Sequence, residues 1–148
     1  MEIKTIDGQK TLCIRQTVKP DEIGPTLDRI FPEIWQYASS QNLQITGPPY
    51  ARTYSITDTS VDLEGGMPVT DPGAGNGRIV PAELPGGKAV SAIHMGSYDK
   101  LCNAYEAATA WIAERKLEKS GAPWETYLND PRETPEAEWK TQLLFPVQ

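Results

Sequence analysis

The sequence has few of the residues on which metal and redox chemistry depend. Its 148 residues include one histidine, His94, and only two cysteines, Cys13 and Cys102. The cysteines stand far apart, each within an apolar segment, so buried free thiols are expected in place of a disulfide. A single histidine without a close pair of cysteines argues against a zinc site. No metal or other cofactor is therefore predicted.

Long apolar runs and clusters of positive charge are also missing. No stretch approaches the roughly 20 apolar residues of a membrane-spanning helix. The N-terminus lacks the basic-then-apolar pattern of a signal segment. The chain is therefore expected to be cytoplasmic and to make no membrane contact. The formal net charge is -6, and no basic run offsets it, so direct DNA binding is not expected.

The chain does contain an internal repeat. Hydrophobic residues make up 39% and charged residues 23%, which suits one domain over residues 1–148. Gly-Pro-Pro-Tyr-Ala-Arg-Thr-Tyr at 47–54 is echoed by Gly-Ala-Pro-Trp-Glu-Thr-Tyr at 121–127. The repeat halves are accordingly placed at about 1–70 and 78–148.

Hydrophobic periodicity predicts a strand–helix–strand–strand order in each half, with one additional hairpin strand. Apolar residues at three- and four-residue spacing predict helices over 23–38 and 101–112, the first with a kink or break at Pro32. Pro85-Gly86-Gly87 is interpreted as a hairpin turn, and the glycine-rich segment 70–78 as a flexible connector. Strands are expected at 11–17, 50–56, 61–69, 79–84, 89–95, 124–128 and 139–147.

These elements predict an α+β fold with an antiparallel sheet and two main helices on one side of it. Two copies of one unit usually pair about a pseudo-twofold axis, and the groove between them is the expected ligand site. Aligning the copies matches Arg52 with Glu125 and Tyr54 with Tyr127. The tryptophans of the two helices, Trp35 and Trp111, are expected in the core more than in ligand contact.

The strand at 124–128 carries the most distinctive chemistry. Side chains alternate along a strand, so Glu125 and Tyr127 share a face. If the apolar faces of the last two strands both point to the helices, Gln142 and Leu144 share that reverse face. A carboxylate among rings suits a planar or cationic ligand, because each ring adds roughly 0.5–2 kcal/mol of cation–π attraction. Two structural alternatives stay open: Glu125 pairs with Arg52, or it is solvated on an exposed sheet face.

Several segments together resemble a known family. His94-Met95-Gly96-Ser97-Tyr98 resembles an H-x-G-x-Y segment, and residues 101–112 resemble the helix that follows it. Residues 124–131 resemble an E-x-Y-x-x-D-P run, and residues 139–147 are similar to a closing T-E-I-Y-x-P-I/V strand. In order and spacing these segments resemble the GyrI-like small-molecule-binding family, the effector-binding domain of AraC-type and other multidrug-sensing regulators. The resemblance extends over nearly the whole chain.

The resemblance implies a duplicated strand–helix–strand–strand (SHS2) fold with an aromatic-lined groove, a buried glutamate at Glu125, and bulky, often cationic aromatic ligands. The sequence departs from the family pattern at Gln142, where a second glutamate is frequent, and at Leu144, where tyrosine is frequent. Both departures reduce the expected preference for cations and favour a neutral aromatic ligand. The candidate ligand-binding residues are Glu125, Tyr127, Gln142, Leu144, Tyr54, Arg52, Trp111, Met67 and Tyr37.

Three functions stay open. The leading one is a stand-alone module that sequesters or senses a small aromatic molecule, since the chain starts at the first strand with no helix-turn-helix segment before it. The second is a hydrolase of cyclopropane-containing DNA-alkylating compounds, with Glu125 and Tyr127 as candidate catalytic residues. The third is a protein partner, such as a topoisomerase like gyrase or a regulator. His94 is expected to be structural.

Overall fold

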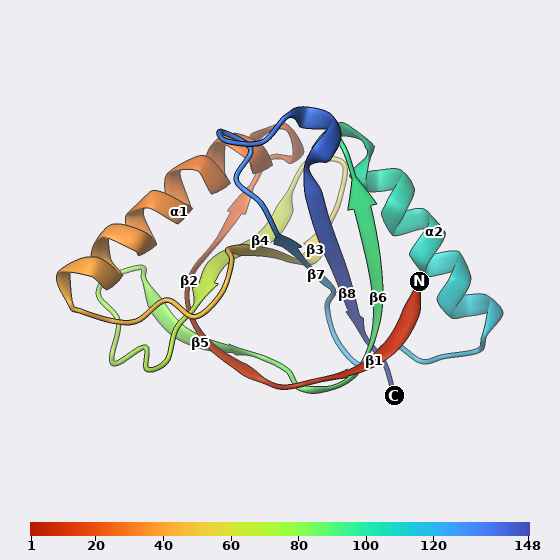
Figure 1. Cartoon of the computed structure of the whole chain (residues 1–148), viewed down its shortest axis with the longest axis horizontal. Coiled ribbons are helices and arrows are strands. Elements are labelled where there is room, and N and C mark those ends of the chain that lie inside the picture. Colours follow the sequence, from red (N-terminus) through yellow and green to blue (C-terminus); the bar gives the residue numbers. More distant parts are fainter. The chain divides into compact units, whose positions relative to one another are not determined.

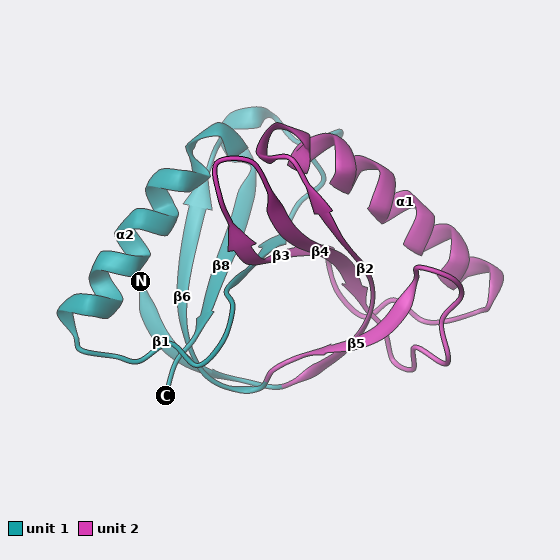
Figure 2. Ribbon diagram, turned by 180° about the vertical axis from the view of Figure 1, so that it is seen from behind, with its two compact units in different colours: residues 1–7, 86–148 teal, residues 8–85 magenta.

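The computed structural model describes residues 1–148, and the chain separates into two compact units (Figure 2). Unit 2 comprises residues 8–85, and unit 1 comprises residues 1–7 together with 86–148. Each unit combines four antiparallel strands with one long helix. The predicted α+β fold with a duplicated strand–helix–strand–strand unit is therefore confirmed.

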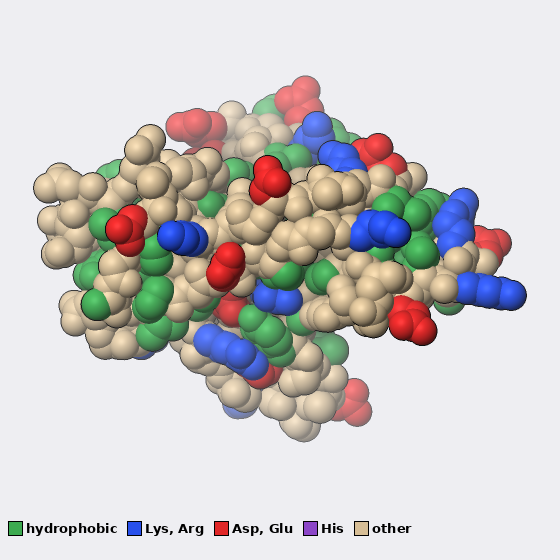
Figure 3. Space-filling model, turned by 90° about the horizontal axis from the view of Figure 1, so that it is seen from below, with side chains coloured by type: hydrophobic (Ala, Val, Ile, Leu, Met, Phe, Trp, Pro, Cys, Tyr) green, Lys and Arg blue, Asp and Glu red, His purple; other side chains and the backbone are tan.

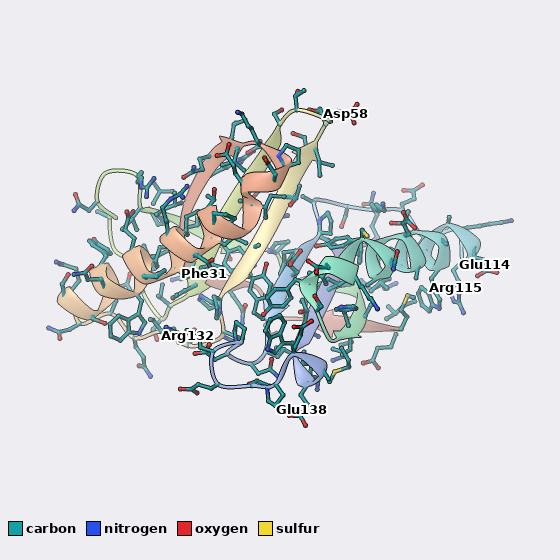
Figure 4. The ribbon with its side chains drawn as sticks, turned by 90° about the horizontal axis from the view of Figure 1, so that it is seen from above. Phe31, Asp58, Glu114, Arg115, Arg132 and Glu138 are labelled. Atoms are coloured by element: carbon teal, nitrogen blue, oxygen red, sulfur yellow. The ribbon has the colours of Figure 1, made fainter.

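Unit 2 follows the predicted order of elements (Figure 1). Its strands are arranged β3-β4-β2-β5, with antiparallel pairing between neighbours. The turn between β3 and β4 carries Asp58 (Figure 4). The elements are β2 (Gln9–Val18), the 3-10 helix η1 (Pro20–Glu22), α1 (Ile23–Ser40), β3 (Tyr50–Ile56), β4 (Val61–Pro68) and β5 (Val80–Leu84).

Unit 1 repeats that arrangement, with the edge strand contributed by the N-terminus. Its strands are arranged β1-β6-β8-β7, again antiparallel. The elements are β1 (Glu2–Ile6), β6 (Gly87–Met95), the 3-10 helix η2 (Tyr98–Lys100), α2 (Leu101–Glu114), β7 (Trp124–Tyr127), the 3-10 helix η3 (Glu136–Glu138) and β8 (Lys140–Pro146).

Two strand predictions need correction. The strand at Glu2–Ile6 has no counterpart in the predicted set, because its five residues are too few to show a clear alternation and four of them are exposed. The predicted hairpin around Pro85-Gly86-Gly87 is wrong as well. β5 pairs with β2, whereas β6 pairs with β1 and β8. The Pro-Gly-Gly segment therefore links two units instead of turning one strand back on its neighbour.

α1 has the predicted apolar stripe, and this stripe forms a core with β2 and β4. Pro32 does not break the helix, because Pro32 and Asp28 are exposed and water can bond the Asp28 carbonyl that Pro32 leaves unpaired. Trp35 is 58% exposed, so its predicted core position is wrong. It falls beside the buried stripe instead of within it. The buried core residues of this cluster are Leu12, Ile14, Ile30, Ile34, Ala38, Met67, Val69 and Ile79.

The apolar face of α2 packs in the same way on unit 1. Partly buried Tyr105 and Trp111 border this core, and the helix ends at Glu114, beside Arg115 (Figure 4). The core residues are Val90, Ala92, Ala108, Ile112, Leu143, Phe145 and Val147. Neither α1 nor α2 has the length and hydrophobicity needed to cross a bilayer.

Strand register gives a residue-by-residue equivalence between the units. Both β4 and β8 end in a proline that valine follows, at Pro68-Val69 and Pro146-Val147. Tyr50 opposes Gly66 in unit 2, and Trp124 opposes Leu144 in unit 1. These pairs fix the alignment of β3 with β7 and of β4 with β8.

The register matches Ala51 with Glu125 and Glu64 with Gln142. The predicted match of Arg52 with Glu125 is therefore displaced by one position. The cause is a bulge in β3, where the pairing with β4 shifts between Thr53 and Ser55. The additional residue, Tyr54, made the two sequence motifs look aligned at their C-terminal ends.

Candidate functional site

Glu125 and Tyr127 lie on the face of β7 that α2 covers. Glu125 opposes Leu143 on β8, and Tyr127 opposes Thr141. Directly opposed residues of antiparallel strands share a face. Leu143 belongs to the core formed with α2, so the Glu125 carboxylate points to the helix side of the sheet.

Gln142 and Leu144 lie on the other face, so their expected position beside Glu125 is wrong. Gln142 opposes Thr126, and Leu144 opposes Trp124. The assumption that apolar side chains mark the helix side fails here, because Trp124 is only 2% exposed and Leu144 only 8%. Gln142 donates a hydrogen bond from Nε2 to Ser91 Oγ at 3.0 Å.

Two tyrosines bind the Glu125 carboxylate, one to each oxygen. The Tyr105 hydroxyl of α2 donates to Oε1 at 2.8 Å, and the Tyr127 hydroxyl donates to Oε2 at 2.7 Å. Burial raises the pKa of Glu125, and the two tyrosine bonds and the charge of His94 lower it by less. Burial and the nearby carboxylate raise the pKa of both tyrosines. Both hydroxyls therefore stay protonated and serve as donors.

Aromatic rings surround this carboxylate. The Tyr98 ring is stacked on Trp139, with centroids 4.8 Å apart and planes 28° apart. Tyr98 also contacts Tyr127, with centroids 5.5 Å apart and an interplanar angle of 58°. Tyr105 meets Phe145 edge-on at 5.7 Å. Apart from buried Phe145, these side chains are all partly exposed.

Local turns hold the cluster in place. Gly96 has a φ of +105°, which favours glycine and turns the chain after β6. His94 Nε2 lies 2.9 Å from the Ser97 carbonyl, and Ser97 Oγ accepts the Asp99 amide at 3.2 Å to start η2. Trp139 Nε1 donates to the Thr134 carbonyl at 2.8 Å. These bonds position Tyr98 and Trp139 without contributing a reactive group.

The remaining candidate of unit 1, Trp111, stands apart from this cluster. It lies on α2 against the unit 1 core, with the Arg115 guanidinium carbon 3.8 Å from its ring centroid. Trp111 was expected in the core more than in ligand contact, and it packs partly buried against that core. The loop before β8 carries Arg132 and Glu138 (Figure 4), and Arg132 binds Asp130 through two hydrogen bonds.

Four candidates belong to unit 2. Met67 is 7% exposed within the α1 core, and Tyr37 borders that core. Tyr37 also lines a shallow depression of about 390 Å³, together with Glu33 and Ile79. Tyr54 and Arg52 lie on β3, where the Arg52 guanidinium carbon is 5.0 Å from the Tyr54 ring centroid.

Unit 2 contains a second carboxylate bound by two tyrosines, at Glu64. The Tyr50 hydroxyl donates to one oxygen at 2.5 Å, and the Tyr54 hydroxyl donates to the other at 2.6 Å. Glu64 is 4% exposed. In the sequence, Asp62 and Glu64 alternate with Val61 and Leu63, a pattern typical of a solvated face. This pattern predicts a strand buried on one face only, whereas all but Asp62 of β4 is buried.

Sequence reasoning missed one direct partner of Glu125, Tyr105, and two rings that adjoin its other partner Tyr127, namely Tyr98 and, stacked on it, Trp139. Tyr105 lies four residues after Leu101 on the apolar face of α2, a spacing that places it toward the sheet. That signal was available. Tyr98 and Trp139 meet only through the loops after β6 and before β8, and no periodicity in the sequence links them.

Charge is distributed without a basic patch on the face drawn in Figure 3, where Lys and Arg side chains are interspersed with Asp and Glu. No group of three or more His, Cys, Asp and Glu side chains is placed to hold a metal ion. The chemistry of the Glu125 cluster is therefore that of a carboxylate, phenol hydroxyls and ring faces.

A family model described as the GyrI-like small molecule binding domain matches residues 1–148. Comparison with curated protein sequences gives no significant match. Among solved structures, the crystal structure of the EcmrR C-terminal domain is 28% identical, with a TM-score of 0.86. The match covers 99% of this chain and 96% of that one.

A cryo-EM structure of EcmrR bound to DNA is 27% identical, with a TM-score of 0.85. The match covers 99% of this chain and 56% of that chain, so this chain spans little more than half the length of that protein.

Two more distant structures share the fold. A hydrolase from Listeria innocua is 14% identical, with a TM-score of 0.69, over 99% of this chain and 91% of that one. SAV2435 bound to tetraphenylphosphonium is 13% identical, with a TM-score of 0.67, over 99% of this chain and 93% of that one.

Proposed function

Because the chain belongs to the GyrI-like small-molecule-binding family, we propose that it binds bulky aromatic compounds, cationic ones included, beside Glu125. The site we propose consists of Glu125, Tyr127, Tyr105, Tyr98 and Trp139, all within unit 1. This proposal retains Glu125 and Tyr127 from the predicted set and adds their aromatic neighbours.

One observation carries the proposal: a half-buried carboxylate receives only neutral phenol donors from its own unit. Both oxygens accept tyrosine hydroxyls, and burial raises the pKa of Glu125. A buried carboxylate without full compensation is costly in the empty protein. A ligand cation placed against the carboxylate offsets part of that cost. A carboxylate with a purely structural role would be compensated within the protein and would need no such cation.

The rings set the shape of the ligand. Tyr98, Tyr127 and Trp139 present ring faces and edges within one cluster, which suits a ligand with several aromatic groups. Cation–π attraction adds to this at about 0.5–2 kcal/mol for each well-placed ring. SAV2435, which shares the fold, has a structure bound to tetraphenylphosphonium. This ligand combines several aromatic groups with a positive charge.

The test compares tetraphenylphosphonium with triphenylphosphine oxide, a neutral compound of similar aromatic content, by quenching of tryptophan fluorescence. We expect saturable binding of both, with the cation bound more tightly. Tyr98→Leu removes the central ring and should weaken both ligands by about tenfold, or about 1.4 kcal/mol.

Tyr37→Leu is the matched control, since Tyr37 is a half-buried tyrosine of the other unit. Its binding curves should equal those of the unmodified chain. Equal affinities for Tyr98→Leu and the unmodified chain, or a loss confined to Tyr37→Leu, would contradict the proposed location.

A further inference from the structure

The sheet face of unit 2 that points away from α1 carries a row of alternating charge. Leu12, Ile14 and Met67 face α1. Residues an odd number of positions away from them along β2 and β4 face the other way. Arg15 on β2 opposes Glu64 on β4, and Glu64 opposes Arg52 on β3. An acidic side chain therefore stands between two basic ones on neighbouring strands.

Arg15 binds elsewhere than its opposed carboxylate. Its guanidinium donates from Nε to Asp62 Oδ1 at 2.9 Å and from Nη2 to Asp62 Oδ2 at 2.8 Å. The same group lies over the Tyr54 ring, with its carbon 3.7 Å from the ring centroid. The Tyr54 hydroxyl in turn donates to Glu64.

The Arg15 side chain is thus a planar cation held between a carboxylate fork and an aromatic face. Its side chain is 48% exposed and that of Asp62 is 32% exposed. Exposed ion pairs of this kind are weak, because water solvates both partners well. Glu64 is, by contrast, buried, and half-buried Tyr54 is bound to it through its hydroxyl.

We propose that Asp62, Tyr54 and Glu64 form a second binding site, for a planar amidinium or guanidinium ligand, and that the Arg15 side chain occupies this site in the free protein. An aryl amidinium offers the same fork of N–H donors to Asp62 and the same flat cation to Tyr54. Its aromatic body adds stacking that arginine lacks. The site lies entirely in unit 2, so it goes beyond the proposed function at Glu125.

The ligand must displace the Arg15 side chain, so Arg15 competes with the ligand for Asp62 and Tyr54. Removing its guanidinium should raise affinity, an outcome opposite to that of removing an ordinary contact residue. The Glu64 carboxylate, shielded by Tyr54, adds long-range attraction for the incoming cation. The same carboxylate contributes to the electrostatic stabilisation of charged Arg15.

The probe is the fluorescent aromatic diamidine DAPI, titrated against the full chain. Arg15→Met should bind DAPI roughly three- to tenfold more tightly than the unmodified protein. Arg15→Lys keeps the charge but loses the planar fork, so it should also raise affinity, by less. Tighter binding by Arg15→Met with no change for Arg15→Lys would indicate net charge alone and overturn the proposal.

Arg78→Met is the matched control. Arg78 forms the same two-bond pair with Glu33, at 2.9 and 2.8 Å, in the same unit. The Arg78→Met substitution removes one positive charge from a comparable ion pair and leaves the contacts of Tyr54 unchanged. Its DAPI affinity should equal that of the unmodified chain, and a gain matching that of Arg15→Met would refute competition by Arg15.

Two double variants locate the ligand. Adding Tyr54→Leu to Arg15→Met should abolish the gain. Adding Asp62→Asn instead, which leaves the hydrogen bonds of Glu64 intact, should do the same in a variant expected to fold normally. The Arg15 series is repeated with Glu125→Gln in every variant, which weakens cation binding at the site proposed in unit 1. The gain from Arg15→Met should persist there, so failure here and failure of the Glu125 site are distinguishable. A gain that survives Asp62→Asn would overturn the assignment.

Discussion

Replacing Glu125 by glutamine separates a ligand site from a structural carboxylate. The amide has nearly the same shape as the carboxylate, and it can keep both tyrosine contacts. Its oxygen accepts one hydroxyl, and its NH2 group donates to the oxygen of the other. The substitution therefore removes charge while leaving the number of hydrogen bonds at Glu125 unchanged.

The magnitude follows from two opposing effects. A hydrogen bond to a charged acceptor contributes about 1.5–3 kcal/mol and a neutral one about 0.5–1.5 kcal/mol, so the amide loses about 2 kcal/mol over the two tyrosines. It also removes the desolvation penalty of a carboxylate, which amounts to roughly several kcal/mol for a buried ion. The raised pKa of Glu125 indicates that desolvation is the larger effect. We expect Glu125→Gln to stabilise the protein by about 1 kcal/mol at neutral pH, a rise in Tm of roughly 2–4 °C.

The pH dependence has a definite sign. Below the pKa of the unfolded chain, Glu125 is protonated in both states and its charge costs nothing. Between that pKa and the higher pKa of the folded state, the folded protein binds more protons than the unfolded chain. This contribution to stability therefore falls as pH rises through that window. The stability difference between Glu125→Gln and the unmodified protein should grow over the same window and then level off.

Thermal melts across the pH range, paired with tetraphenylphosphonium titrations, measure both effects. Stability should rise while preference for the cation over triphenylphosphine oxide falls by about tenfold, since a unit charge near a half-buried carboxylate interacts by roughly 1–2 kcal/mol. Glu64→Gln is the control, because Glu64 also accepts two tyrosine hydroxyls but lies in unit 2. A Glu125→Gln variant that is destabilised and keeps its cation preference would refute the reasoning, as would an equal loss of preference in Glu64→Gln.

Three further outcomes follow from the structure. Gln142→Glu should leave the cation preference at Glu125 unchanged, because Gln142 faces the opposite side of the sheet. A higher preference for tetraphenylphosphonium over triphenylphosphine oxide would place the ligand on the Trp124 face. Gly66→Ala should destabilise unit 2 by about 2 kcal/mol in urea unfolding, because the new Cβ would lie 2.7 Å from both the Leu12 carbonyl and the Tyr50 hydroxyl; unchanged stability would contradict that packing. With a thiol reagent at pH 8, the native protein should react at exposed Cys102 only, since burial raises the pKa of Cys13 to about 12; fast labelling of two thiols before unfolding would be inconsistent with it.

The sequence carried enough information for the helices and most strands, because their apolar periodicity is strong. The stripe through Ile30, Ile34 and Ala38 predicted α1, and its packing confirms it. Pro32 was misread because its effect depends on exposure: a proline on the solvent side leaves a carbonyl that water can bond. The segment around Glu125 and Tyr127 was identifiable from the motif, and the two side chains do share a carboxylate–hydroxyl bond.

The side on which Glu125 lies could not be predicted in the same way. Period-two alternation tells two faces apart only when one is polar, and on β7 and β8 both faces are buried: Trp124 and Leu144 on one, Leu143 on the other. Only the register decides, and register is set by pairing across strands. The bulge at Tyr54 could not be predicted from the sequence either. A single inserted residue changes the pairing of β3 with β4 but leaves the apolar pattern of the strand almost unchanged.

The register also changes what the repeat means for function. Glu125 corresponds to Ala51, and Glu64 corresponds to Gln142, so each unit has a carboxylate where the other has a neutral side chain. Glu125 faces the helix of its unit, whereas Glu64 faces away from its own. Both nevertheless accept two tyrosine hydroxyls. The two carboxylate–tyrosine centres therefore did not arise as copies of one another. The two sites we propose therefore take different ligands, because one carboxylate is bordered by stacked rings and the other by arginines.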